Sequence, residues 1–179
     1  MSNLSTTLTF VAPEEAVPAT LTSVDDVLDS ALGSYVCDPY LQATSRNGWV
    51  RFKMCELVKA YKSADLGYLC NLAVVLRSDS LDRAISAVRQ LLALMDETPA
   101  VCTAVVNGSS KYYADGDVKK LLVCPPTSVD EALKRYDNCR WCDEGDDLPT
   151  LVAFVYAHLF VLEYAQASGL CAVYATHDH

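Results

Sequence analysis

The segment 148–167 constrains the fold of this chain more than any other. Pro149 suits the first turn of a helix, and Gly169 suits the position just after its end. Between them, apolar residues fall on every side of the expected helix: Val152, Phe154, Val155, Tyr156, Leu159, Phe160, Leu162 and Tyr164. A helix without a polar stripe must be covered all round. We therefore expect this one to be sandwiched between other helices or between subunits.

Shorter segments also have helical patterns. Thr22 or Ser23, followed three residues later by a carboxylate, predicts a helix start, and an apolar stripe follows it to Gly33. We expect further helices over about 64–76, capped by Ser63, and over 81–95, capped by Ser80. The stretch PTSVDEALKRY has the clearest signature, because Ser128 and Glu131 have the spacing of a capping box. The stretch NGWVRFKMCELVKAY favours a strand at its start and a helix later.

Helical segments dominate, so the sequence predicts a mainly α fold: an antiparallel four-helix-bundle-like core with short extra helices or a small β-hairpin. At 179 residues the chain is most simply one domain, 1–179. Residues 1–21 favour an extended arm or loop containing a short strand. Residues 98–124 leave two alternatives open, because Thr98-Pro99 suits short helices and Asn107-Gly108 suits a hairpin.

Charge and hydropathy limit the classes of partner. Fourteen basic against twenty-three acidic side chains give a formal net charge of -9. Simple electrostatic binding of nucleic acid by a monomer is therefore disfavoured, although a repeating array with one or two arginines per copy stays open. The densest apolar run, 148–165, is broken by His158 and Glu163, so it falls short of the about 20 residues of a membrane span. The N-terminus has no signal-peptide pattern, and we expect a soluble intracellular protein.

The eight cysteines give one recognisable motif, the Cys-x-x-Cys of Cys139 and Cys142. A structural zinc site usually combines four Cys or His ligands, so this pair is a weak metal candidate and a reduced loop pair is the simpler interpretation. Four other cysteines, at positions 55, 70, 102 and 171, lie in apolar segments and are expected to behave as small buried hydrophobes.

Catalytic patterns give no support for an enzyme. The sequence contains no nucleophile elbow, no phosphate-binding glycine loop and no dinucleotide fingerprint. His158 lies in the middle of an apolar helix, where a hydrogen-bonded core imidazole is the simplest interpretation. We therefore expect no catalytic residues and no cofactor.

The order of these segments resembles the coat proteins of rod-shaped, tobamovirus-type plant viruses. The resemblance is collinear over much of the chain, although each fragment alone is short. Its fragments are STTLTFV at 5–11, LDSALG at 28–33, VRF at 50–52, PTSVDEALKRYDN at 126–138, DDLPTLVAFVYAHLFVLEYAQASG at 146–169, and the closing SGLCAVYAT.

The resemblance implies a bundle of four principal helices with both chain termini on the outside. Copies of the subunit would assemble helically around single-stranded RNA, in a virion and in the host cytoplasm. The positions similar to the family's RNA contacts are Arg77, Arg83, Arg135, Asp137, Asp146 and Asp147. Arginines would pair phosphates, and the acids would orient bases.

Asp130 is similar to a family carboxylate that faces an acid of the neighbouring subunit. Such a pair makes assembly depend on pH and divalent ions, but a first-turn helix acid explains Asp130 equally well. The chain also departs from the family: CRWCDEG splits one motif, residues 96–124 have no counterpart, and the arginine early in the long helix is missing. The alternative is an acidic α-helical protein–protein interaction module, viral or not, that binds a host protein through an apolar groove and has neither RNA binding nor enzymatic activity.

Overall fold

A computed structural model describes residues 5–36, 42–45, 48–108, 112–137 and 148–178. The longer helices are α2 (Gly48–Ala60), α3 (Ser78–Glu97) and α7 (Leu148–Ser168). The shorter ones are α1 (Val24–Leu28), α4 (Pro99–Val106), α5 (Asp115–Val123), α6 (Val129–Asp137) and the 3-10 helices η1 (Glu14–Ala16), η2 (Ala31–Ser34) and η3 (Ala64–Cys70). The strands are β1 (Ser5–Ala12), β2 (Gln42–Ser45), β3 (Ala73–Leu76) and β4 (Cys171–Asp178). The prediction of a mainly α protein is confirmed.

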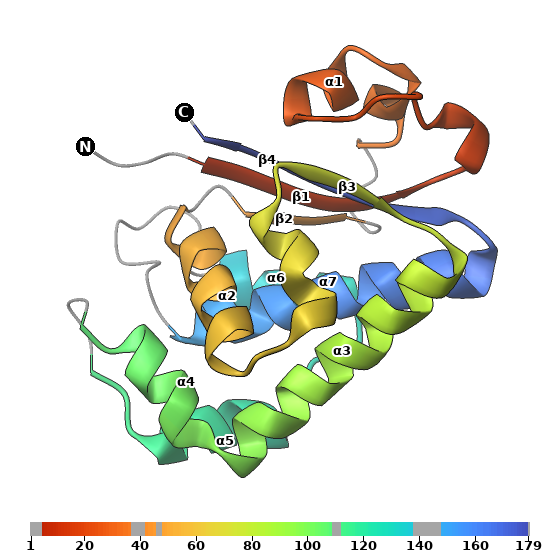
Figure 1. Cartoon of the computed structure of the whole chain (residues 1–179). Coiled ribbons are helices and arrows are strands. Elements are labelled where there is room, and N and C mark those ends of the chain that lie inside the picture. The colour runs from red at the N-terminus through yellow and green to blue at the C-terminus, as the bar shows by residue number, and fades with distance from the viewer. Residues whose placement is uncertain (1–4, 37–41, 46–47, 109–111, 138–147, 179) are drawn as a thin grey trace.

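The four strands form one antiparallel sheet in the order β2-β1-β4-β3. The first and last strands pair over their whole length, from Ser5 opposite Asp178 to Ala12 opposite Cys171. Strand β2 pairs with β1 on one side, and β3 pairs with β4 on the other. The two ends of the described chain therefore lie side by side at the same end of the sheet (Figure 1).

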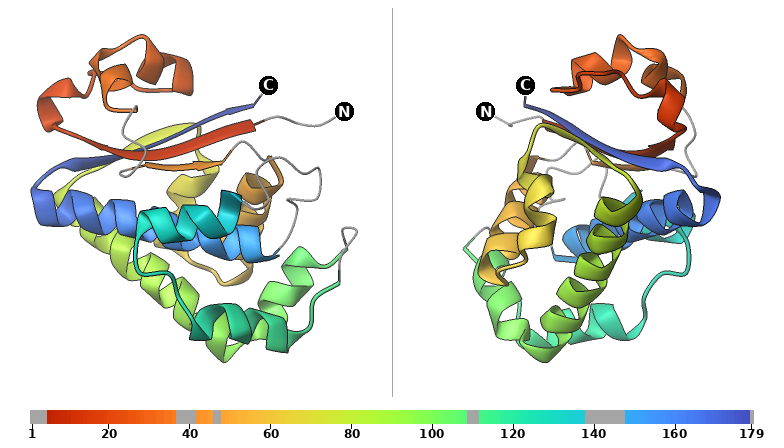
Figure 2. Two further views of the ribbon diagram at one scale, coloured as in Figure 1. Left: turned by 180° about the vertical axis from the view of Figure 1, so that it is seen from behind. Right: turned by 45° about the vertical axis from the view of Figure 1, so that its right-hand side comes forward.

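Helices cover both faces of this sheet, but unequally (Figures 1 and 2). Among the described residues, the outer face packs against the short elements between β1 and β2, through a small apolar core that includes Phe10, Val27, Leu32 and Val173. The inner face packs against α7, and the main core continues from there into α2 and α3 and on to α4, α5 and α6. We call residues 13–36 the outer layer, and the helices on the other face the inner layer.

Helix α7 forms the centre of the inner layer. It begins at Leu148 and ends at Ser168, as predicted, and Gly169 follows with φ +65°, the left-handed conformation that ends many helices. Its length and composition would suit a membrane span, but 72% of its apolar window is buried inside the molecule. The sheet covers one side, and α3 and α6 flank it. The chain thus buries this helix itself, and part of the cover is a sheet where we expected helices or subunits.

The largest error in the predicted elements concerns the segment 64–76. We expected one helix, but a 3-10 helix ends at Cys70 and strand β3 begins at Ala73. The β-branched Val74 and Val75 suit the edge of the sheet, where they pair with Tyr174 and Val173. The C-terminal strand was missed for the same reason, because the apolar run of β4 takes its conformation from its neighbours.

Other boundaries differ less. The expected strand at NGWVRF is helical from Gly48 onward. Residues 98–124 form the two short helices of the predicted alternatives, and Asn107 closes the loop between them through two hydrogen bonds to the backbone of Tyr113, at 2.9 and 2.8 Å. The predicted first helix is α1 followed by η2, and its capping box between Ser23 and Asp26 is present.

Two predicted caps are altered. Helix α3 begins at Ser78, two residues before the expected cap, and Ser80 bonds the backbone of Arg77. At α6, the Ser128 hydroxyl accepts from the Glu131 amide at 3.1 Å, as expected. The Glu131 carboxylate instead accepts from the amide and hydroxyl of Thr127, both at 2.8 Å.

Candidate functional site

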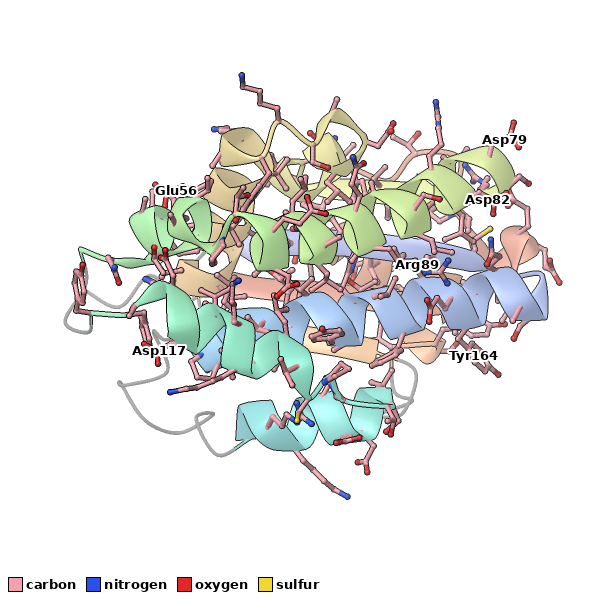
Figure 3. All side chains as sticks on the ribbon, turned by 90° about the horizontal axis from the view of Figure 1, so that it is seen from below. Glu56, Asp79, Asp82, Arg89, Asp117 and Tyr164 are labelled. Carbon is pink, nitrogen blue, oxygen red and sulfur yellow. The ribbon has the colours of Figure 1, made fainter. Side chains whose placement is uncertain are left out.

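Among the described residues expected to contact RNA, Arg77 and Arg83 lie far from the start of α7. Arg77 and Arg83 lie at the start of α3, beside the C-terminal end of α7, where Asp82 accepts a hydrogen bond from Gln166 at 2.6 Å. Figure 3 shows Asp79 and Asp82 near this end of α7. Along its length, α7 is flanked by α3 on one side and by α6 on the other. The other end of α7, at Leu148, is about 30 Å away for a helix of 21 residues. Asp146 and Asp147, which precede Leu148 in the sequence, lie outside the described residues.

Two of the predicted arginines, Arg77 and Arg135, form ion pairs or hydrogen bonds within the chain. Arg77 forms an ion pair with Glu14, with Nε 2.6 Å from Oε1. Arg135, on α6, donates to the Cys124 carbonyl at 2.6 Å and to Glu131 at 2.9 Å. Arg83 is exposed on α3. Asp137 is the last residue of α6, and its side chain is not described. These contacts give Arg77 and Arg135 local structural roles.

Asp130 also has a local role. Its carboxylate lies 2.8 Å from the Nζ of Lys134, one helical turn later on α6. Such an exposed pair stabilises the helix modestly. The weak metal candidates Cys139 and Cys142 lie outside the described residues, and among the residues that are described no three Cys, His, Asp or Glu side chains gather closely enough to hold a metal ion.

A buried polar network crosses the inner face of the sheet. His158, in the middle of α7, is fully buried, with Thr9 Oγ1 2.8 Å from Nδ1 and Tyr68 Oη 2.5 Å from Nε2. A neutral imidazole has one N–H and one lone pair, so one hydroxyl donates to the ring and the other accepts from it. The prediction of a hydrogen-bonded core histidine is confirmed.

The surroundings of His158 keep the ring neutral. Its neighbours are the rings of Phe154, Tyr68 and Tyr174, which provide no counter-charge. Burial lowers the pKa of His158 to about 3 and raises the pKa of Tyr68 well above its ordinary value. Both ring nitrogens of the buried His158 are hydrogen-bonded, so this network joins β1, η3 and α7.

The outer layer differs in charge from the rest of the molecule. Residues 13–36 contain five carboxylates, of Glu14, Glu15, Asp25, Asp26 and Asp29, and neither lysine nor arginine. Asp26 accepts from the backbone and hydroxyl of Thr22, which lowers its pKa, and Glu14 pairs with Arg77 from α3. Glu15, Asp25 and Asp29 are exposed.

Two apolar side chains are exposed on the same layer. Leu28, at the end of α1, is 57% exposed, and Tyr35, just after η2, is 40% exposed. Their neighbours Val27 and Leu32 are fully buried against the outer face of the sheet. The layer therefore combines a negative charge with exposed apolar contact area, which is the composition of a surface that binds a basic partner.

Sequence analysis did not identify this layer as a site. The signal was present, since the first Lys or Arg of the chain is Arg46. The sequence could not show that this acidic segment would lie together on one face, because its helices are too short for a clear periodicity. No family model, curated protein or solved structure matches this chain.

Proposed function

We propose that this protein is a binding protein rather than an enzyme, and that its outer layer binds a positively charged protein surface. One observation carries the proposal: five carboxylates without a single Lys or Arg in residues 13–36, on a layer that also exposes Leu28 and Tyr35. This is the interaction-module alternative of the sequence analysis, assigned to a particular face.

The physical role of each group follows from its exposure. Glu15, Asp25 and Asp29 attract a basic partner over several ångströms and speed association. Leu28 and Tyr35 provide the apolar area that holds the partner after contact. Asp26 and Glu14 hold the layer in shape, through the cap of α1 and the ion pair with Arg77.

A charge-matched pair of variants tests the proposal. Glu15→Gln with Asp29→Asn removes two charges from the outer layer, and Asp96→Asn with Glu97→Gln removes two at the C-terminal end of α3, in the inner layer. The immobilised proteins are incubated with extract from the cells that produce the protein, and bound proteins are quantified by mass spectrometry. We expect a basic protein that the wild type and the α3 variant retain and the outer-layer variant loses at least about tenfold, an effect of about 1.4 kcal/mol.

Two results would contradict this. Equal capture by all three proteins would exclude a role for the outer-layer charges. Loss from both variants alike would show that only total charge matters. A drop in capture with rising salt for the wild type checks that the attraction is electrostatic.

The second candidate is a viral coat protein subunit that assembles helically around single-stranded RNA. The observation in its favour is the pairing of β1 with β4, which brings the two chain ends together at one end of the sheet, as the resemblance implies for termini on the outside of a rod. The separation of Arg77 and Arg83 from the start of α7 weighs against a single RNA groove made by the expected residues.

Electron microscopy separates the two candidates. Purified protein is examined by negative stain at pH 5.5 and pH 8, with and without single-stranded RNA. Rods or stacked discs that lengthen at low pH or with RNA would favour the coat subunit, and Asp130 and Arg135 would be the first residues to replace. Particles of one or two chains under every condition would contradict the coat subunit and favour the binding protein.

A further inference from the structure

Two cysteines meet where α2 packs against η3. Cys55 lies on α2 and Cys70 is the last residue of η3. Both are reduced and half-buried, which differs from the fully buried positions we expected for them. The Cys55 Sγ donates to the Leu69 carbonyl oxygen, 3.5 Å away, and Leu69 is the residue directly before Cys70.

We propose that Cys55 and Cys70 are a redox-modification site, at which a hydroperoxide converts the two thiols into a reversible intramolecular disulfide. Because the Cys55 sulfur contacts the backbone of the residue directly before Cys70, we expect side-chain rotations to bring the two sulfurs to the about 2 Å of an S–S bond. The other cysteines differ: Cys102 is fully buried, Cys171 donates to Glu14 at 2.8 Å, and Cys124 is exposed.

The chemistry balances with hydrogen peroxide as the oxidant. The Cys70 sulfur, as thiolate, attacks one peroxide oxygen and breaks the O–O bond, which gives a sulfenic acid and, after protonation, water. The Cys55 sulfur then attacks the sulfenic sulfur, the S–S bond forms, and a second water leaves with the proton of Cys55. Two thiols lose two electrons in total, and one peroxide is reduced to two waters.

The surroundings decide this order of attack. Burial first, and then the contact with Cys70, raise the pKa of Cys55 to about 12, so Cys55 keeps its proton near neutral pH and suits the second step. Arg51 and Lys59, one turn away on either side along α2, offset only a small part of this rise.

Disulfide formation leaves no buried carbonyl without a donor. The Leu69 oxygen loses the Cys55 S–H, but it also accepts from the Tyr174 hydroxyl at 2.8 Å, and that bond stays. Loss of the last donor to a buried carbonyl would have opposed the oxidation. The bridge would covalently join α2 to the segment that leads into β3.

Peptide mapping of the full chain tests the proposal. Wild-type protein is treated with hydrogen peroxide, remaining thiols are alkylated, and the protein is digested with trypsin. We expect the peptides 54–59 and 63–77 to appear joined, two hydrogens lighter than their sum, and to separate after treatment with dithiothreitol. We also expect Tm to rise by about 5–10 °C on oxidation, because the bridge closes a loop of about 15 residues.

Matched variants keep the test decisive. Cys70→Ser should abolish both the joined peptide and the rise in Tm. Cys124→Ser, which replaces an exposed cysteine, should change neither. Circular dichroism checks that both variants fold. The proposal is overturned if Cys55 and Cys70 stay separately alkylated while other cysteines oxidise, or if either one pairs preferentially with a third cysteine.

Discussion

The two faces of the sheet are covered in different ways. The outer face packs against short helices through aliphatic and aromatic carbon alone, and its covering layer is acidic and exposed on its far side. The inner face carries the buried hydroxyls of Thr7, Thr9, Tyr174 and Thr176. Thr9 and Tyr174 contact His158, and the hydroxyls of Thr7 and Thr176 lie 3.4 Å apart. Every one of those hydroxyls needs a partner in a fixed position, whereas aliphatic contacts tolerate small shifts. The inner face therefore defines the geometry of the fold, and the outer layer is the part that can move or bind at low cost.

Among the changes that test this difference between the two layers, truncating a buried side chain of the inner layer should lower the free energy of unfolding most. Leu151 is fully buried on α7, and Leu151→Ala leaves a cavity at the centre of the main core. We expect the free energy of unfolding to fall by about 3 kcal/mol. Urea denaturation followed by circular dichroism measures it, and a loss below about 1 kcal/mol would show that the inner layer is less tightly packed than its burial indicates.

Acid should act on the inner face through His158. The folded pKa is about 3, below the ordinary 6.5, so the unfolded chain binds the extra proton. The stabilisation is complete above pH 6.5 and is lost progressively as the pH falls below it. We expect wild type to lose about 1–2 kcal/mol between pH 7 and pH 5.5, before most carboxylates titrate.

The variant His158→Gln isolates this effect. Glutamine keeps a donor and an acceptor for Thr9 and Tyr68 but does not titrate in this range. Its unfolding midpoint in urea should be lower than that of wild type at pH 7, yet almost the same at pH 5.5 as at pH 7. An equal pH dependence in both proteins would mean that His158 is not the group responsible.

The outer layer should open locally. Leu32 is fully buried against the outer face, and Leu32→Ala should weaken the protection of residues 13–36 from hydrogen exchange by about 2 kcal/mol. Protection in α3 and α7 should change less. Leu28→Ala, at an exposed position of the same layer, is the matched control and should change protection by less than about 0.5 kcal/mol. Equal loss in both layers would show that they unfold as one unit.

The smallest effect is expected at the surface of the inner layer. Arg89 on α3 donates to Glu163 on α7 at 2.6 Å, and both side chains contact solvent (Figure 3 labels Arg89). Arg89→Ala should lower the free energy of unfolding by less than about 1 kcal/mol, and by still less in high salt. Differential scanning calorimetry at two salt concentrations checks this. A larger loss of unfolding free energy would show that surface ion pairs contribute substantially to the stability of the inner layer.

The elements that sequence analysis predicted are those whose signals are local. The Ser23–Asp26 cap, the glycine after α7 and the apolar faces of α3 and α7 each depend on residues within a few turns. Strand β3 and strand β4 depend on each other across nearly a hundred residues, as in the pairing of Val74 with Tyr174. Their local patterns did not distinguish strands from helices or tails.

The same distinction applies to the sites. The hydrogen-bonded state of His158 was predicted correctly, because a buried histidine in an apolar helix needs hydrogen-bond partners, whichever elements provide them. The pairing of Cys55 with Cys70 was not predicted, because an expected helix over 64–76 gave no reason to bring the two together. The 3-10 helix that ends at Cys70 instead brings the Leu69 carbonyl, beside Cys70, against Cys55 of α2.

The pairing of β1 with β4 also has a consequence for synthesis. Residues 5–12 leave the ribosome well before their partner, residues 171–178, is made. At about 5–20 residues per second, the N-terminal strand waits on the order of ten seconds or more before its partner exists. During that interval β1 can pair only with β2, and its other edge is open to any other nascent chain nearby. Correct pairing of β1 thus depends on how quickly residues 171–178 become available.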